Sequence, residues 1–417
     1  MQKVNPFNET YSKIEKSYES WQKLAMKPYD PESTSPFTKV RIILMNGTEF
    51  EANWFSHQFS RHCPDNNLRR EIALIRRREQ QQQKKIASLK PISESVLQHT
   101  MGYEQLAVEL TAILAKHVTD KNVKMALDFA LLEDFDHVFR YANLLEMDEG
   151  IKAEKLLGCY TEIMPGRPTI SEHRYPADEI KNYIDSNKAD LFTKLTTHII
   201  TAAEQQTMNF YMNQANFYPN ELGRKLFSEI AMIEEQHVSQ YGSLLDTNCT
   251  WLECLLMHEY TECYLYYSCF EDESVDYIKD LWYQLYLEEC GHLKKAADLL
   301  KKYEDKKWET LFPGGAEFPE LLKFGENKEY VRKVLKETGC YTADKEWYEK
   351  VQNVPEKDEF FAYNRKVNKP ESSVASHQVI EKHIKEFGID YRYEESSNPI
   401  PSLRDRKSDN TEFGRFK

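Results

Sequence analysis

Hydrophobic residues recur with the three-to-four-residue spacing of amphipathic helices between about residues 93 and 303. Short polar stretches interrupt this pattern at 118–122, 217–221, 244–250 and 270–274. These stretches are rich in Asn, Asp, Pro, Ser and Thr, which favour turns and helix starts over helix interiors. The pattern predicts an all-α region of three helical hairpins, with about six core helices.

A long connection separates the first predicted hairpin from the second. It covers residues 162–190, "EIMPGRPTISEHRYPADEIKNYIDSNKAD", and is rich in Pro, Gly and charged residues. Most connections between helices in a compact domain are much shorter. We therefore expect a crossover between the first two hairpins and short turns elsewhere.

Two less periodic segments flank this region. Residues 37–55, "FTKVRIILMNGTEFEANWF", alternate apolar and polar positions around an Asn-Gly pair, which predicts a small β-hairpin. Residues 66–90 lack Gly and Pro and predict a basic helix with a solvated face. The predicted organisation is an N-terminal extension (1–92), a helical bundle (93–305) and a C-terminal extension (306–417) with short helices, such as 327–339, and a loosely held tail of about twenty residues.

The composition is that of a globular protein with a large core, since 41% of the residues are hydrophobic and 12% are aromatic. Sixty-eight acidic residues against 55 Lys and Arg give a formal charge of −13. This charge argues against a broad nucleic-acid or anionic-membrane surface. The start has no apolar segment of signal-peptide length, and no run reaches the roughly 18 apolar residues of a membrane span, so we expect a cytoplasmic location and no membrane partner.

None of the eight cysteines forms a CxxC pair, which excludes a rubredoxin-like or zinc-ribbon module. Electrons for any redox chemistry must then come from an external donor. We expect the cysteines to be reduced and largely buried.

An internal repeat carries the candidate chemistry. The segments "HVFRYANLLE" (137–146) and "HVSQYGSLLD" (237–246) share a histidine, a valine, a tyrosine, two leucines and a final acid. The segment "HLKKAADLL" (292–300) repeats the histidine, the next apolar position and the two leucines. An acid precedes each histidine by three residues, in the pairs Asp134/His137, Glu234/His237 and Glu289/His292.

A glutamate also lies thirty residues before each of these acids: Glu104, Glu204 and Glu259. The midpoints of the three intervals, near positions 119, 219 and 274, all fall in predicted turns. In an antiparallel hairpin, two residues equally far from the turn lie at the same height. Each hairpin should therefore place one Glu level with an acid and a His one turn further on.

Helical bundles that bind two iron or manganese ions need such a pattern. They use a carboxylate from each of two helices and an acid-x-x-His pair from each of two others. Carboxylates can bridge two cations, and four carboxylates balance the charge of two divalent ions. Without metal, the same groups would form a costly buried cluster of like charges.

The pattern resembles the ferritin-like di-metal carboxylate superfamily, including its rubrerythrin-like and oxygenase-like branches, over about residues 93–303. The resemblance implies a ferritin-like helical bundle, two iron ions with manganese as an alternative, and oxidoreductase chemistry with O2 or peroxide on an unknown small-molecule substrate. A homodimer is compatible with it. Position by position, it assigns one metal site to Glu104, Asp134, His137, Glu204, Glu234 and His237.

The sequence departs from this family pattern in two ways. Asp134 stands where Glu is usual, and a third hairpin adds Glu259, Glu289 and His292. Three arrangements stay open: hairpins one and two share the site, hairpins two and three share it, or all three surround an enlarged site with a third metal ion.

Other interpretations of the same residues compete with metal binding. Each histidine alone is more typical of a hydrogen-bonded core position, Tyr141 and Tyr241 of core tyrosines, and Cys263 and Cys290 of buried thiols. Nearby competitors for the ligand positions are Glu109, Glu133, Glu262 and His258. At the level of function, the alternatives are a non-catalytic iron-handling protein and a tRNA-hydroxylating relative, for which salt-sensitive tRNA binding is the test.

Overall fold

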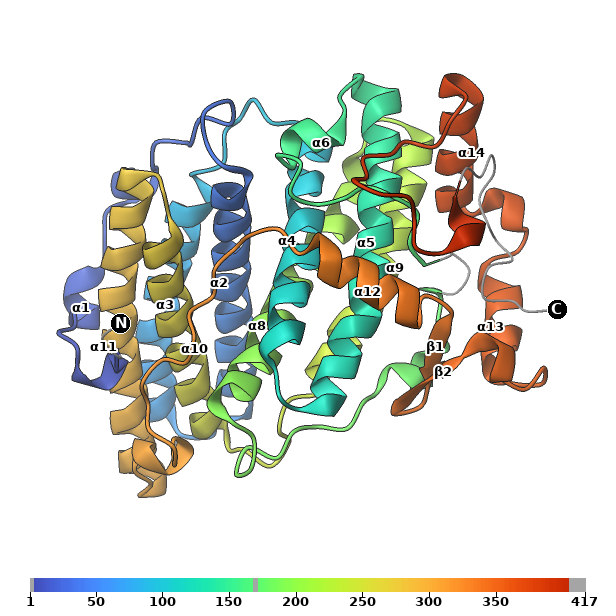
Figure 1. Ribbon diagram of the computed structural model, residues 1–417. Helices are drawn as coiled ribbons and strands as arrows, with labels where there is room; N and C mark the ends of the chain where they lie inside the picture. Colours follow the sequence, from blue (N-terminus) through green and yellow to red (C-terminus); the bar gives the residue numbers. More distant parts are fainter. Residues whose placement is uncertain (1–3, 168–171, 405–417) are drawn as a thin grey trace. The chain divides into compact units, whose positions relative to one another are not determined.

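The computed structural model describes residues 4–167 and 172–404, and these are mostly helical, as predicted (Figure 1). The predicted loose tail lies largely outside the described residues. The long helices are α2 (Pro36–His62), α3 (Asn66–Ala87), α4 (Val96–His117), α5 (Lys121–Glu149), α8 (Leu191–Phe217), α9 (Glu221–Gly242), α10 (Trp251–Asp272) and α11 (Asp276–Glu304). The shorter helices are α1 (Ile14–Ser17), α6 (Ala153–Leu156), α12 (Lys328–Thr338), α13 (Glu359–Val367) and α14 (Ala375–Phe387). Strands β1 (Tyr341–Asp344) and β2 (Trp347–Lys350) pair antiparallel.

Each of the four predicted turns separates two helices, and side-chain caps explain three of the helix starts. The Asp120 side chain accepts hydrogen bonds from two backbone N–H groups at the start of α5, at 2.8 and 3.0 Å. Asn220 caps α9 in the same way. Thr250 and Glu253 form a reciprocal capping box at the start of α10. These side chains satisfy N–H groups that the helix itself leaves free.

The β-hairpin predicted for residues 37–55 is wrong, because this segment lies within α2. Most of the polar residues in this segment are themselves buried. Arg41 is 3% exposed, and its guanidinium pairs with Glu273 at 2.9 Å and with Asp272 at 2.7 Å. Helix α2 is therefore packed on several sides. The alternation of apolar and polar residues does not mark one buried and one exposed face, as it would in a half-exposed strand.

Helix α3 confirms the predicted basic helix, but its polar residues are only partly solvated. Arg78, Glu79 and Gln82 are buried among neighbouring helices. Arg78 pairs with Glu288 of α11 at 2.6 Å. This helix is a part of a packed core rather than an appended surface element.

The chain divides into two compact units that differ from the predicted domains. Unit 1 consists of Met1–Ser93, Ile184–Ala203 and Leu245–Phe324. Unit 2 consists of Glu94–Tyr183, Glu204–Leu244 and Gly325–Lys417. The predicted bundle of residues 93–305 is thus divided: the first two hairpins lie mainly in unit 2, and the third joins the N-terminal helices in unit 1.

Four long helices form the core of unit 1. α2 packs against α3 and α10, α11 packs against α10 and α3, and the four run side by side in Figure 1. Tyr266 of α10 and Trp282 of α11 lie in this core with their ring centroids 6.0 Å apart.

Unit 2 is built around α4, α5, α9 and the second part of α8. α5 packs against α4 and α9. Tyr103 of α4 stacks on Phe210 of α8 at 4.4 Å between centroids, and Tyr211 of α8 contacts Phe227 of α9 at 5.7 Å. From the C-terminal region, α12 packs on α5, and α14 packs on α5 and α9. This part of the predicted C-terminal extension is therefore integrated into unit 2.

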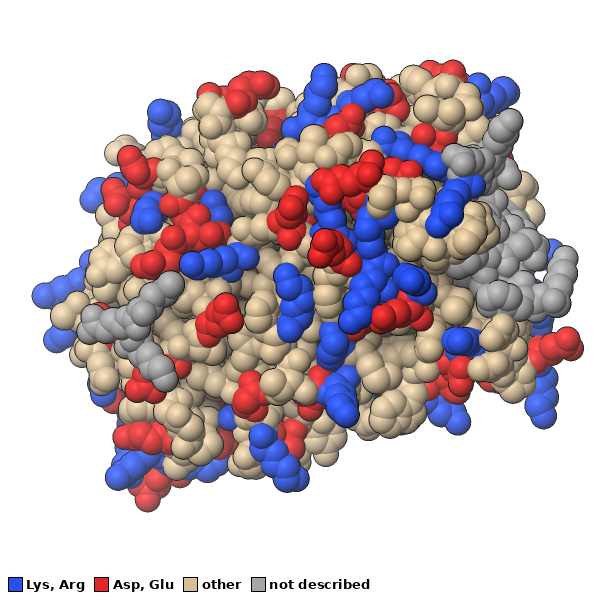
Figure 2. Space-filling view, viewed as in Figure 1, with Lys and Arg blue, Asp and Glu red and all other residues tan. Residues whose placement is uncertain are grey.

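Acidic and basic side chains are interspersed over the visible face in Figure 2. Across the described parts of the chain, no helix combines the length and the apolar character needed to cross a membrane.

Candidate metal centre

Six of the predicted site residues come together inside unit 2, one or two from each of its four core helices. They are Glu104 (α4), Asp134 and His137 (α5), Glu204 (α8), and Glu234 and His237 (α9), all at most 1% exposed. The potential ligand atoms of Asp134, Glu204, Glu234 and His237 lie within 4.8 Å of one another, and so do those of Glu104, His137 and Glu234. Glu234 belongs to both groups, so the two sets of potential ligands are adjacent and share one carboxylate.

Both histidines direct the Nδ1 atom toward this carboxylate. His137 Nδ1 lies 3.1 Å from Glu234 Oε1, and His237 Nδ1 lies 3.1 Å from Glu234 Oε2. His237 Nδ1 also lies 3.3 Å from Asp134 Oδ1. The two imidazoles therefore flank Glu234, with ring centroids 6.3 Å apart.

The far side of each imidazole faces a second carboxylate. His237 Nε2 lies 2.7 Å from Glu133 Oε2, and His137 Nε2 lies 3.7 Å from Glu172 Oε2. A metal-ligating histidine commonly donates its second ring N–H to a carboxylate, which fixes its tautomer and orientation. Glu133 and Glu172 are placed for this role, although only Glu133 is within hydrogen-bond distance.

Three fully buried arginines hold these outer carboxylates. Arg167 Nη1 lies 3.1 Å from Glu133 Oε1, and Arg174 also pairs with Glu133. Arg140 Nη1 lies 2.6 Å from Glu172 Oε2. Arg167, Glu172 and Arg174 come from the long crossover, so this connection supplies the surroundings of the histidines.

Several inner carboxylate oxygens lack hydrogen bonds from the described residues. Neither oxygen of Glu204 accepts a hydrogen bond from the described residues, and His237 Nδ1 is 3.8 Å from Oε2. Glu104 Oε2 is likewise 3.9 Å from His137 Nδ1, whereas its Oε1 accepts a 2.5 Å hydrogen bond from Tyr211. Buried oxygens without donors cost free energy, and bound cations would satisfy them.

The charges within this cluster are centred on Glu234. Burial alone would raise the pKa of Glu234, but hydrogen bonds from His137 and His237 lower it to about 2. Burial and repulsion between carboxylates raise the pKa of Glu104 and Glu204 well above the usual value.

The histidines complete this pattern. Burial alone would lower their pKa, but Glu172 and Glu234 raise the pKa of His137 well above its usual value. Asp134 and Glu133 do the same for His237. The Nδ1 atoms of His137 and His237 thus carry protons, which they would have to release in order to bind two cations.

Tyr141 and Tyr241 are fully buried in the same unit. Neither hydroxyl has a hydrogen-bond partner among the described residues, and the Tyr241 ring centroid is 6.2 Å from that of His237. Tyr141 packs against Tyr211 at 5.4 Å between centroids. These contacts agree with the sequence-based expectation of core tyrosines.

The third predicted hairpin lies in unit 1 and has different neighbours. Ligand-type atoms of Glu259 and His292 lie within 4.8 Å of Glu79, and those of Glu259 and Glu289 do so with Glu262. Hairpins one and two therefore form one cluster within unit 2, and hairpin three joins α3 in another cluster within unit 1. The two-hairpin arrangement that follows the crossover is the one found in unit 2.

Sequence reasoning missed Glu79 as a candidate, and it also missed the outer residues Glu172, Arg140, Arg167 and Arg174. A signal for Glu79 existed, because Glu49 and Glu79 are separated by the same thirty residues as the other three pairs. This pair lacks the histidine of the other three, since Gln82 stands three residues after Glu79. Cys263 and Cys290 are buried, and in the described part of the chain neither joins a group of potential ligands.

No protein-family model, curated protein or solved structure matches this chain.

Proposed function

We propose that the unit 2 cluster binds two divalent iron or manganese ions, and that the chain is an oxidoreductase of the ferritin-like di-metal carboxylate type. The observation that carries this proposal is the pair of ligand groups that share Glu234. Four helices supply four carboxylates and two imidazoles, which is the donor set of dinuclear helical-bundle sites. The four negative charges balance two divalent cations.

Each residue then has a distinct role. Glu234 would be a ligand of both ions. Glu104 and His137 would hold one of them, and Asp134, Glu204 and His237 would hold the other. Glu133 holds the imidazole of His237 through its Nε2 atom, and its own negative charge is held by Arg167 and Arg174.

Two such ions, when bound, supply electrons in pairs to O2 or peroxide. The protein surrounds them with residues that are almost completely buried, which excludes bulk water and strengthens the electrostatic interactions. A small organic substrate and an external electron donor complete the proposed reaction.

The test is the metal content of the full-length protein, produced with iron or manganese and purified without chelator. We expect Glu234→Ala to lose about two ions per chain relative to the unaltered protein. Glu235→Ala is the matched control, because Glu235 is the next residue on α9 and is not in either ligand group. Equal metal content in the two variants would contradict the proposal.

Activity is tested separately, by following O2 and peroxide consumption after anaerobic loading with Fe(II) and addition of a reductant. We expect consumption in the unaltered protein and in Glu235→Ala, and a large loss in Glu234→Ala. Metal binding without consumption would favour the non-catalytic iron-handling alternative.

A further inference from the structure

Unit 1 contains a second buried cluster of ligand-type side chains, formed by its own four core helices. Its members are Glu49 (α2), Glu79 and Gln82 (α3), Glu259 and Glu262 (α10), and Glu289 and His292 (α11), all at most 1% exposed. Two groups within it have potential ligand atoms that lie within 4.8 Å of one another: Glu79, Glu259 and His292, and Glu259, Glu262 and Glu289. Glu259 belongs to both, as Glu234 does in unit 2.

The helices that carry this cluster repeat the arrangement of unit 2. The interval from Glu49 to Glu79 has its midpoint at Pro64, between α2 and α3. The Tyr266 hydroxyl donates a hydrogen bond to Glu49 Oε1, as Tyr211 does to Glu104. Each of these tyrosines lies seven residues after the glutamate of its own helix, Glu259 or Glu204. The sequence therefore contains a fourth copy of the hairpin, with Gln82 in the place of the histidine.

Buried polar atoms in this cluster lack partners. Glu79 Oε2, Glu259 Oε2 and the Nε2 atom of His292 have no hydrogen-bond partner among the described residues. Gln82 Nε2 donates to Glu289 Oε1 at 2.6 Å, which leaves Gln82 Oε1 without a donor. The unpartnered oxygens of Glu79 and Glu259 belong to residues of the ligand groups, and their desolvation is not compensated by hydrogen bonds from the described residues.

Five carboxylates and a single imidazole make this cluster richer in oxygen donors than that of unit 2. His292 Nδ1 lies 3.0 Å from Glu289 Oε2 and 3.7 Å from Glu259 Oε2. The additional carboxylate is Glu262, one turn after Glu259 on α10. Carboxylate and amide oxygens favour hard divalent cations such as Mn2+ over cations that prefer nitrogen or sulfur ligands.

We propose that unit 1 holds a second dinuclear centre for hard divalent cations, with Glu259 as the bridging carboxylate. It is distinct from the centre proposed for unit 2 and does not depend on it.

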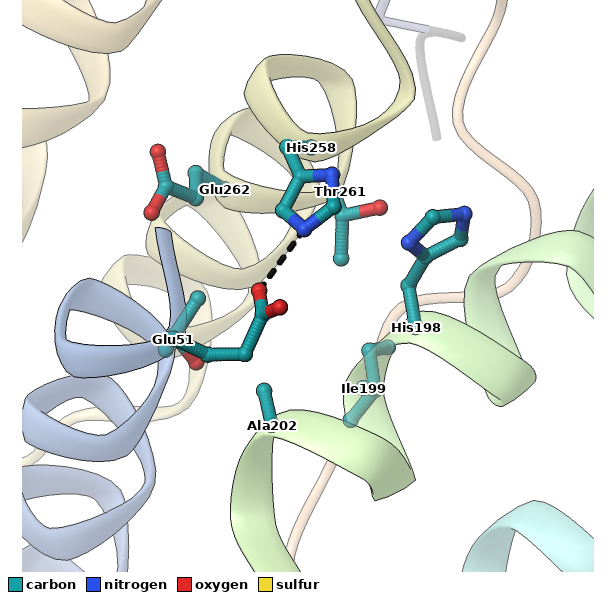
Figure 3. Close-up of a pocket in the computed structure, with 8 residues that line it drawn as sticks. Glu51, His198, Ile199, Ala202, His258, Thr261 and Glu262 are labelled. Carbon is teal, nitrogen blue, oxygen red and sulfur yellow. Dashed lines mark hydrogen bonds and ion pairs between the residues drawn. The ribbon is translucent and has the colours of Figure 1, made fainter. Parts of the chain in front are cut away.

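A small cavity lies beside this cluster and shares Glu262 with it. Its volume is about 10 Å³, sufficient for about one water molecule. Figure 3 shows Glu262 on one side of it, and Glu51, His198 and His258 on the others. His258 Nε2 lies 2.7 Å from Glu51 Oε2. Glu262 belongs to both the cavity and the cluster, so a water molecule in the cavity would lie beside one of the proposed ligands.

Metal counting with Mn(II) as the only added ion tests the proposal. The full-length protein is loaded, desalted and analysed by mass spectrometry. We expect about four ions per chain in the unaltered protein and about two in Glu234→Ala, which leaves unit 1 intact. If Glu234→Ala retains no manganese, the second centre does not exist.

Variants in unit 1 provide the complementary measurement. We expect Glu259→Gln to lose about two ions per chain and to retain those of unit 2, so that the retained ions also report that unit 2 is folded. Glu271→Gln, an exposed position on the same helix, is the matched control and should retain all the ions. A folded Glu259→Gln protein with the same manganese content as the control would overturn the proposal.

If Glu259→Gln fails to fold, the count in Glu234→Ala still decides the question. If folded Glu234→Ala holds no manganese and the unaltered protein holds only about two ions per chain, the second centre is contradicted and the first is supported. Retention of all four would contradict the proposed role of Glu234 instead.

Discussion

At the scale of single residues, Glu234 has a role that no other inner carboxylate shares. Its two oxygens lie 3.1 Å from the Nδ1 atoms of two different histidines, and its pKa is lowered to about 2. In the metal-free protein it is thus the negative partner of two protonated imidazoles. Loss of this charge would remove the shared partner of both Nδ1 atoms and leave each protonated imidazole only its other carboxylate neighbours, such as Glu133 and Glu172.

Glu234→Gln should therefore destabilise the metal-free protein. Removal of one partner from a buried ion pair typically costs about 3–5 kcal/mol. The free energy of unfolding, measured by denaturant titration in the presence of chelator, should fall by an amount in this range. Glu235→Gln is the control, and an equal, small effect of both substitutions would show that Glu234 is not the centre of the charge pattern.

Glu133 allows a test of how the histidines are oriented. It accepts from His237 Nε2 at 2.7 Å but belongs to neither group of potential ligands. Glu133→Gln should weaken metal binding by about 10–100-fold without a change in stoichiometry at saturation, as expected for a residue behind a ligand. A chelator competition titration measures this change. An unaltered affinity in the folded variant would assign Glu133 a purely structural role.

At the scale of elements, the sequence predicts those helix boundaries that depend on neighbouring residues, but not those elements that depend on distant partners. The helix starts near Asp120, Asn220 and Thr250 could be predicted because an N-cap acts on residues two or three positions away. Helix α2 could not, because Arg41 is satisfied by Glu273, more than two hundred residues later in the chain. No local pattern indicates such a partner, so the alternation of apolar and polar residues favours a strand in the sequence alone.

The same distinction applies to the candidate site. The six residues in unit 2 follow from equal intervals around turns, which are local properties of hairpins. The pairing of Glu133 with arginines of the crossover depends on how a long connection folds back, and a sequence pattern does not encode it. Glu79 is intermediate in how well the sequence predicts it. It follows Glu49 by the regular thirty residues, but the residue three positions after it is Gln82 and not a histidine.

The cap of α5 provides a prediction at this scale. Asp120→Ala removes the acceptor for two backbone N–H groups and should lower the free energy of unfolding by about 1 kcal/mol. Thermal or denaturant unfolding measures the change, with Lys121→Ala as the neighbouring exposed control. A metal content below that of the control would contradict a purely local effect.

At the scale of the whole molecule, the formal charge of −13 includes acids that do not contribute to the surface. The two clusters together bury nine carboxyl groups: Glu49, Glu79, Glu104, Asp134, Glu204, Glu234, Glu259, Glu262 and Glu289. Bound divalent cations would neutralise much of this charge inside the protein. Stability should then depend on both pH and metal.

The metal-free protein should lose stability as the pH rises above neutrality. His137 and His237 have raised pKa values in the folded state, so their contribution is full below the unfolded value near 6.5 and disappears as the pH passes the folded values. Glu104 and Glu204, also with raised pKa values, oppose folding increasingly as the pH rises above the unfolded value. Differential scanning calorimetry should show a falling Tm between pH 6 and 9 with chelator.

Metal should reverse this trend, because cations replace the protons that the ligands must release. The difference in Tm between the metal-loaded and the metal-free protein should therefore grow with pH over the same range. A difference that stays constant with pH would contradict proton release from the ligands.

The order of the helices along the chain has a consequence for assembly. The helices that carry the unit 2 cluster, α4, α5, α8 and α9, are complete by residue 242, whereas α2 and α3 meet their partners only when α10 and α11 have been synthesised. Contacts between distant parts of a chain form late, because a long loop must be closed first. Pulse-labelled hydrogen exchange should find α4 and α5 protected before α2 and α3, and simultaneous protection would contradict this order. During synthesis, the helices of the unit 2 cluster would therefore be complete while the unit 1 cluster still lacks α10 and α11.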